Sequence, residues 1–305
     1  MSTNAIISTR NLDINRVSFV VGQAKNGRNA SINIKYDGQN IGIRLPRLAF
    51  PGGVLSRTDD KTGAVGYSLM GSLKGADPYG KDRANDADES GKLYNFLLDL
   101  NEKIVQSATE NSVKWFGKKR SEEAIRDGMK SLMRLSVDKV DGEYIPNGKY
   151  PPSLVLKVPV YDGRVNVDLA EEYMYKNNKG VDTIGIRDVY TTPQSLSTTI
   201  PKGVEANIAV SASIYVMAGG GFGVTWRVSH VLLPIRKVVT TSSIFADLLG
   251  NAEDDDVEEP SQSQAPAPSP AAVPEVPFEV PDLDEDAPAP APAPQRKRRT
   301  ATPAV

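Results

Sequence analysis

The strongest constraint on the fold is a pair of long alternating segments separated by a cluster of glycines. Residues 206–218 read ANIAVSASIYVMA, and residues 224–233 read VTWRVSHVLL. In both segments apolar residues recur at every second position, which is the period of a strand with one buried face. The glycines at 219, 220, 221 and 223 supply the positive backbone angles of a tight turn. The segment therefore predicts a hairpin, with Phe222 at its exposed apex, Trp226 in the barrel wall and Arg227 on the opposite face.

A phosphate-binding loop is the alternative interpretation of these glycines, and their context excludes it. Such a loop follows a strand, opens a helix and has the spacing GxxxxGK[ST] or GxGxxG. Here no Lys-Ser or Lys-Thr pair follows the glycines, and the next segment alternates as a strand does. His230 continues the apolar face of that strand and has no nucleophile near it in sequence. We interpret it as a core or barrel-mouth histidine rather than a catalytic base.

Alternation with a period of two recurs on both sides of a helical region. It is present in the segments ASINIKYDG (30–38), NIGIRLPRL (40–48), PSLVLKVPVYDGRVNV (152–167) and DTIGIRDVY (182–190). The Asp-Gly pair that ends the first segment predicts a turn. Residues 56–90 are rich in Gly, Asp and Lys and predict a long surface loop. From Ser90 the apolar residues recur in steps of three and four, which predicts a helical insertion over about 90–134, with a second helix at 122–134.

These segments predict a mainly β fold, an OB-fold-like antiparallel barrel that carries the helical insertion. A closed barrel is favoured because it leaves few unpaired strand edges. A jelly-roll sandwich is the competing all-β architecture.

Charge divides the chain into two parts. Residues 251–305 hold 12 Asp and Glu against 4 Lys and Arg, a net charge of −8, and 12 of the 22 prolines. Residues 1–250 therefore keep 32 basic and 26 acidic residues, a net charge of +6. We predict one nucleic-acid-binding domain over 1–250 and a disordered, acidic, Pro/Ala-rich tail over 251–305. The tail either competes for the basic surface and recruits other proteins, or serves only solubility.

Several classes of protein are excluded by composition. The chain has no Cys and one His, which removes thiol catalysis, disulfides and zinc sites. No carboxylate pair or calcium-loop spacing is present, so we expect no enzyme, no metal and no cofactor. No apolar run reaches membrane-spanning length, and we expect a soluble intracellular protein. The basic cluster Arg296–Arg299 is a weak candidate for a nuclear address.

The candidate binding residues combine aromatic rings with positive charge, as single-stranded nucleic acid requires. The run WFGKKR at 115–120 joins both types, although its rings serve equally well to anchor a helix junction. Tyr215 lies among small residues on its strand face, where it is either a stacking platform or an ordinary exposed tyrosine. The full set is Lys35, Arg44, Arg47, Trp115, Phe116, Lys118, Lys119, Arg120, Lys157, Tyr161, Tyr215, Phe222 and Arg227.

A resemblance to a known family rests on two segments. They read KSLMRLSVDKVDGEYIPNGKYPPSLVLKVPVYDG and STTIPKGVEANIAVSASIYVMAGGGFGVTWRVSHVLL, and LPRLAFPGGVL also fits. Over most of 30–240 the chain resembles the single-stranded DNA-binding proteins of nucleocytoplasmic large DNA viruses of algae and protists. Those proteins are relatives of the replication protein of short-tailed phages.

The resemblance implies an OB-fold that binds single-stranded DNA without sequence preference in viral DNA replication, recombination and repair. It also implies that the acidic tail contacts replication proteins such as DNA polymerase or helicase-primase, in the host nucleus or at a cytoplasmic site of viral replication. The phage-type tail is short and ends with acids and an aromatic, whereas this chain ends in RKRRTATPAV. Tail contacts would then lie at 253–259 and 275–286, around Phe278. A homodimer is a further expectation.

Two rival functions remain open from the sequence. The first is a non-enzymatic, capsid-associated minor virion protein, which fits an all-β body with a Pro-Ala linker. The second is an enzyme such as a nuclease or a dUTPase-like hydrolase, which needs convergent carboxylates that the sequence does not show.

Overall fold

The computed structural model describes residues 6–22, 31–60, 62–217 and 219–235. The chain divides into two units, 1–239 and 240–305, and only the first contains described residues. The predicted tail at 251–305, with Phe278 and the basic cluster Arg296–Arg299, lies outside the described residues.

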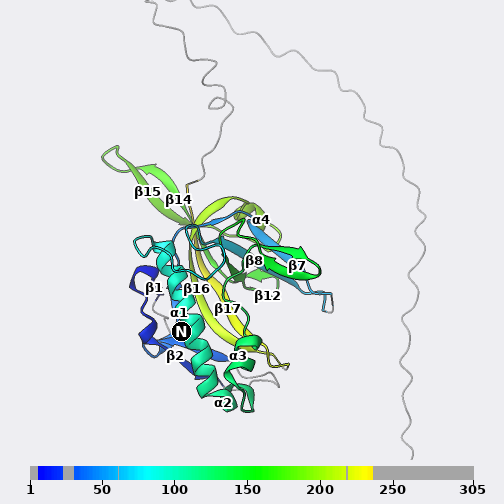
Figure 1. The fold of residues 1–305 in the computed structure, drawn as a ribbon. Helices are drawn as coiled ribbons and strands as arrows, with labels where there is room; N and C mark the ends of the chain where they lie inside the picture. Colours follow the sequence, from blue (N-terminus) through cyan, green and yellow to red (C-terminus); the bar gives the residue numbers. More distant parts are fainter. Residues whose placement is uncertain (1–5, 23–30, 61, 218, 236–305) are drawn as a thin grey trace, which may run out of the picture. The chain divides into compact units, whose positions relative to one another are not determined.

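Five strands close into a barrel (Figure 1). They pair in the order β6–β8–β11–β17–β16, and β16 pairs with β6 to complete the ring. In chain order this is first, second, third, fifth, fourth, the Greek-key order of an OB-fold-like barrel. The predicted fold class is confirmed, with one difference: β11 and β17 run parallel. The five strands are β6 (Leu48–Phe50), β8 (Val65–Ser72), β11 (Ser153–Val158), β16 (Val204–Val216) and β17 (Phe222–Leu233).

β16 and β17 form the hairpin that the glycine cluster predicts, with Val216 opposite Phe222. The Met217 N–H donates to the Gly221 carbonyl at 2.8 Å, and the Gly220 N–H donates to the Met217 carbonyl at 2.8 Å. Gly220 has a φ of +87°, a conformation that L residues with side chains rarely adopt. The guanidinium of Arg120 lies where a Cβ at this position would be, so Gly220 is needed for space as well.

A β-bulge in β17 changes which side chains face the core. Val210 pairs with Val228, but Ala209 pairs with His230, so Ser229 is the extra residue. One extra residue moves the following side chains to the other face. Val231 is therefore buried, whereas His230 is exposed with its Nε2 3.3 Å from Asp168 Oδ2. The prediction that His230 shares the buried face of Trp226 is wrong for this reason.

Beyond the barrel, β16 carries a sheet extension formed by the N-terminal strands. The edge of β16 that does not pair with β17 pairs with β5 and then with β3. A two-residue turn joins β3 to β4, with positive φ at Asp37 and Gly38 as the sequence predicts. The extension comprises β1 (Ile6–Ser8), η1 (Thr9–Asn11), η2 (Ile14–Arg16), β2 (Val17–Val21), β3 (Ile32–Tyr36), β4 (Gln39–Asn40) and β5 (Gly42–Arg44).

The predicted helical insertion is present as α1 (Glu89–Glu110), α2 (Ser112–Phe116) and α3 (Glu122–Gly128). The apolar stripe of α1 is buried in one cluster with the inner residues of β3 and the barrel. α3 ends before the predicted residue 134 because the chain turns to extended backbone, where the Lys130 N–H donates to the Phe222 carbonyl at 2.8 Å. No helix in the described ranges is long and apolar enough to span a membrane.

The surface loop predicted over 56–90 is wrong in its first half. This stretch contains most of β7 (Val54–Thr58) and all of β8, which pair as an antiparallel hairpin. The strand pattern of β8 is hidden because Gly71 occupies a buried position. A Cβ at Gly71 would lie 2.8 Å from Leu48 Cδ1, so the inner face has no room for the apolar side chain that would reveal the period.

The remaining elements lie along the later half of the chain. β14 pairs parallel with β17 and antiparallel with β15 at the end of the main sheet. The others form two small hairpins and one short helix. Their bounds are β9 (Val137–Val140), β10 (Glu143–Pro146), β12 (Val160–Tyr161), β13 (Arg164–Val165), β14 (Asp168–Lys176), β15 (Asp182–Asp188) and α4 (Leu196–Thr199).

The packing at the hairpin turn predicts that Gly220→Ala destabilises the protein by at least about 1–2 kcal/mol, since the left-handed conformation alone costs a residue with a Cβ that amount. The added methyl also displaces Arg120. Gly219→Ala is the matched control, because open space surrounds that position and its φ is not positive. Chemical denaturation measures both variants, and equal stabilities would contradict this account of the turn.

Candidate nucleic-acid interface

The outward face of the barrel brings two of the predicted cations into one row. Lys157 of β11 lies opposite Arg227 of β17 in the parallel register, and Ser68 of β8 lies opposite Lys157 on the other side. Arg227 in turn lies opposite Ser211 of β16. Its Nη1 donates to Ser213 Oγ at 2.7 Å, which holds the guanidinium along the sheet. Two strands far apart in sequence thus place adjacent positive charges on one surface.

Few carboxylates are available on these strands to neutralise the row. β3, β11 and β17 contain no Asp or Glu, and β16 contains only Glu205, which lies near Arg47 at an N–O distance of 3.9 Å. Lys35 of β3 lies on the outward side too. Asn33 pairs with the outward Ser213, and Lys35, two residues further along β3, shares the face of Asn33. The outward face of β3, β11, β16 and β17 is therefore positively charged, and we call it the basic face.

Tyr215 lies on the basic face with its ring across Gly223, the residue opposite it. A Cβ at Gly223 would be 2.9 Å from the Tyr215 hydroxyl and 3.1 Å from Lys130 Cβ. The tyrosine side chain is 37% exposed, and an exposed lysine lies beside it. Sequence reasoning missed Lys130 because it placed this residue in a helix, where it would not have joined the sheet.

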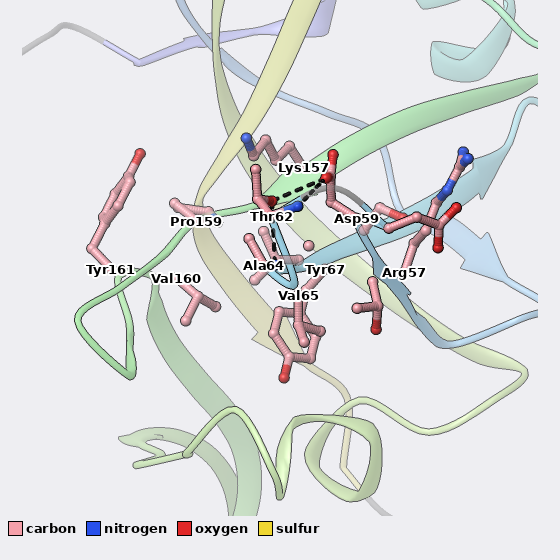
Figure 2. Close-up of a pocket in the computed structure, with 15 residues that line it drawn as sticks. Arg57, Asp59, Thr62, Ala64, Val65, Tyr67, Lys157, Pro159, Val160 and Tyr161 are labelled. Carbon is pink, nitrogen blue, oxygen red and sulfur yellow. Dashed lines mark hydrogen bonds between the residues drawn. The ribbon is translucent and has the colours of Figure 1, made fainter. Parts of the chain in front are cut away.

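A groove of about 900 Å³ adjoins the basic face between the β7–β8 hairpin and the segment from β11 to β12 (Figure 2). Lys157 lies in its wall, and the exposed ring of Tyr161 lies at the β12 end. Sequence reasoning missed Arg57 and Tyr67, which line the opposite side, because they fell in the predicted loop. The second and third strands of an OB-fold and the loop between its first two strands commonly bind oligonucleotides, and the groove occupies this position.

The groove also contains acidic residues at the end of the β7–β8 hairpin. Thr62 donates to Asp59 Oδ1 through its N–H at 2.9 Å and through its hydroxyl at 3.0 Å, and both bonds are drawn in Figure 2. Asp60 lies next to them. The charge in the groove is therefore mixed, whereas that of the basic face is positive.

A second, more apolar hollow of about 520 Å³ lies further along β7 and β8. Leu55 and Met70 line it from β7 and β8, and the exposed Tyr150 and Arg134 line it from the segments beside the β9–β10 hairpin. Along β8 the outward residues lead from Ser68 in the groove to Met70 in this hollow. The two hollows are thus lined by successive outward residues of one strand, Ser68 and Met70, which lie about 7 Å apart at 3.2–3.4 Å per residue.

Three predicted stacking rings pack against one another: Phe222 and Trp115 are buried, and Phe116 is half-buried. Phe222 is 0% exposed and Trp115 is 7% exposed. Their ring centroids lie 6.5 Å apart, and Phe116 contacts both, at 6.3 Å from Trp115 and 5.2 Å from Phe222. Phe19 of β2 adds a fourth ring, 5.7 Å from Trp115. The prediction of an exposed apex at Phe222 is wrong because the strand begins at this residue and turns its ring into the cluster.

The cations of the WFGKKR run are divided by the same packing. Arg120 donates from Nη1 to the Gly220 carbonyl at 2.8 Å and lies 4.6 Å from the centre of the Phe116 ring. It therefore holds the β16–β17 turn. Lys118 and Lys119 remain exposed, next to the left-handed Gly117 that ends α2. Because Arg120 contacts the turn, these two lysines lie near the tip of the hairpin that carries Tyr215.

Arg44 lies on β5 opposite Ala209 of β16, and Arg47 lies between β5 and β6. Arg44 is exposed on β5 and donates to Ser8 Oγ at 3.2 Å, and Arg47 lies near Glu205 as described. Among the described residues no group of three or more Asp, Glu or His side chains is placed to hold a metal ion.

Comparison with known proteins finds a likeness to a solved structure. No protein-family model matches the chain, and no curated protein matches it. The chain is similar to gp2.5, a single-stranded DNA binding protein encoded by bacteriophage T7. The likeness covers 72% of this chain and 98% of that chain, with 14% sequence identity and a TM-score of 0.32. A likeness at this level carries no information about function.

The burial of both tryptophans of the chain predicts its fluorescence. Trp115 and Trp226 are both in the core, so their emission should lie at shorter wavelength than that of free tryptophan and acrylamide should quench it weakly. Saturating oligo(dT) should leave the emission nearly unchanged, because no base reaches either ring. The unfolded chain in guanidinium provides the fully accessible control. Strong quenching by oligo(dT) would contradict the buried placement.

Proposed function

We propose that this protein binds single-stranded DNA without sequence preference, through the basic face and the adjoining groove. The observation that carries the proposal is the Lys157–Arg227 row next to Tyr215, on strands that almost lack carboxylates. Cations arranged along a sheet attract the phosphates of a strand that crosses it. Such contacts carry no base information, which accounts for the lack of sequence preference.

Preference for single strands comes from the rings. Tyr215 is exposed on the basic face, and Tyr161 is exposed in the groove that Lys157 also lines. A base can stack on such a ring only when its own face is free, and in a duplex the neighbouring base pairs cover it. Lys130, Lys118 and Lys119 extend the positive charge beyond Tyr215, toward the hairpin tip. The path therefore offers alternating sites for bases and for phosphates.

The proposal extends to the partners and to the cellular role. We propose that the acidic segment 251–305 competes with DNA for the basic face and recruits replication proteins such as a polymerase or helicase-primase. Support comes from the opposite net charges, −8 for this segment and +6 for residues 1–250. A role in viral replication, recombination and repair rests on the sequence resemblance, as does a nuclear or cytoplasmic replication site, and the proposal includes a homodimer.

The function is tested by titrating the full chain into fluorescently labelled oligo(dT) and into a duplex of equal length, with anisotropy as the readout. We expect tighter binding of the single strand. Equal affinities, or no binding, would contradict the proposal and favour a structural role. A chain truncated after Gly250 should bind oligo(dT) more tightly at low salt, and equal binding would remove the competition by the tail without affecting the main proposal.

Tyr215→Leu should weaken binding of oligo(dT) by about 5- to 150-fold, the equivalent of losing one stacked base at about 1–3 kcal/mol. Leucine still covers Gly223, so the sheet should keep its stability. Tyr190→Leu is the matched control, because Tyr190 follows β15 at the far edge of the sheet and is almost fully exposed. The same loss of affinity in both variants would exclude Tyr215 from the path of the strand.

Lys157→Ala should reduce the steepness of the salt dependence. Each phosphate contact to a single strand contributes about −0.7 to the slope of log K against log salt concentration, so the slope should become shallower by about 0.7. Lys179→Ala is the control, since this exposed lysine lies in the turn between β14 and β15. An unchanged slope in the Lys157 variant would show that this residue contacts no phosphate.

A further inference from the structure

The hollow of about 520 Å³ beside the β9–β10 hairpin is joined to the basic face by one row of paired residues. Arg227 of β17 lies opposite Lys157 of β11, and Lys157 lies opposite Ser68 of β8. Ser68 in turn lies opposite Leu55 of β7, and Leu55 lines the hollow. Residues that are directly paired across a sheet have their side chains on the same face. The row that begins with two cations therefore ends at the hollow.

The walls of the hollow are mainly apolar. Leu55 is 38% exposed, and Met70 shares the outward face of β8 with Ser68. Val137 lines the hollow from β9, and the exposed Tyr150 lines it from the segment after β10. The volume lies within the range of about 300–1,000 Å³ that is typical of sites for small ligands. A flat aromatic group entering the hollow thus meets apolar side chains and a ring on which it can stack.

The charge of the hollow favours an anionic ligand. Among the described residues that line it, Arg134 is the only charged one, and this arginine is exposed. The groove on the other side of Ser68 is different, because Asp59 and Asp60 line it together with its cations. A phosphate next to the hollow would therefore meet a guanidinium without a carboxylate among the lining residues.

The β9–β10 hairpin adds a second ring and a second cation beside the hollow. Lys139 lies two residues after Val137 on β9, so the two share one face of the hairpin, and Lys139 pairs with Tyr144 of β10. Tyr144 is 71% exposed, and Lys139 Nζ lies 6.0 Å from the centre of its ring. Since Val137 lines the hollow, this face of the hairpin adjoins it. Rings and cations thus lie together here as they do on the basic face.

Two kinds of ligand combine a ring with negative charge, as this hollow requires. One is a nucleotide, whose base can stack on a tyrosine while its phosphate meets a cation. The other is an acidic peptide with an aromatic residue, such as the segment 275–286 around Phe278. The row that leads from Arg227 to the hollow favours the nucleotide, because a DNA strand carries phosphates along the whole row, whereas such a peptide needs only the hollow.

We propose that the hollow binds one unstacked nucleobase of a DNA strand that also crosses the basic face. The base stacks on Tyr150 and contacts Leu55 and Met70, while Arg134 binds the adjacent phosphate. This inference rests on the proposed function and extends the path of the DNA over β8 and β7 to the β9–β10 hairpin. Because the faces of a base are covered in a duplex, the hollow adds to the preference for single strands.

The first test locates the bases by photocrosslinking. Oligo(dT) that carries a single 5-iododeoxyuridine, placed at each position in turn, is bound to the full chain and irradiated, and mass spectrometry identifies the crosslinked residues. We expect crosslinks to Tyr150 or Met70, in addition to crosslinks to Tyr215 or Tyr161. Crosslinks confined to Tyr215 and Tyr161 would overturn this inference and leave the proposed function intact. An oligonucleotide that does not bind the chain at all would contradict both.

A second test measures what the hollow contributes to affinity. Tyr150→Leu should weaken oligo(dT) binding by about 5- to 150-fold, the loss expected for one stacked base. Tyr190→Leu is again the matched control, and thermal melts establish that both variants are folded. Wild-type affinity in the Tyr150 variant would overturn the inference. So would a synthetic peptide of residues 275–286 that binds the chain truncated after Gly250 through Tyr150 while bound oligo(dT) gives no crosslink in the hollow.

Discussion

The antiparallel pairing of β16 with β17 is the interaction on which the rest of the structure depends. β16 gives its other edge to β6, β5 and β3 in turn, and β17 gives its other edge to β11 and β14. One hairpin of 13- and 12-residue strands thus carries both the closed barrel and the sheet beyond it. Its inner face builds the core with α1, and its outer face carries Arg227 and Tyr215.

The turn of this hairpin depends on a contact that spans a hundred residues. Arg120 reaches the Gly220 carbonyl and stacks on Phe116, and the rings of Trp115, Phe116 and Phe222 pack beneath the turn. Three of the four glycines of the cluster leave space for a neighbouring side chain. Gly220 makes room for Arg120, Gly221 for Met217 and Gly223 for Tyr215. A glycine cluster that resembles a nucleotide loop by composition is here a set of close packing contacts.

The candidate interface was partly predictable because strand periodicity assigns side chains to faces. Alternation alone places Arg227 and Tyr215 on an outward face, and the structure brings both to one surface with the predicted cation Lys157. Lys130 was not found because the period around it predicts a helix, and Arg57 and Tyr67 were not found because the segments around them show no clear period. In β8 the buried Gly71 interrupts the pattern, and after α3 the chain becomes extended only because it bonds to Phe222.

By itself, the sequence determined the β-rich class, the central hairpin, the Asp37–Gly38 turn and the position of α1, because these depend on local periodicity and on turn residues. The tertiary structure alone decided what the WFGKKR rings and Arg120 do. Aromatic residues next to basic ones have the same composition whether they stack on bases or pack under a turn, and only contacts with Phe19, Gly220 and Phe222 distinguish the two. The tertiary structure alone also decided the bulge at Ser229. The single extra residue in β17 turns His230 outward, although the alternation in the sequence predicts that it faces inward.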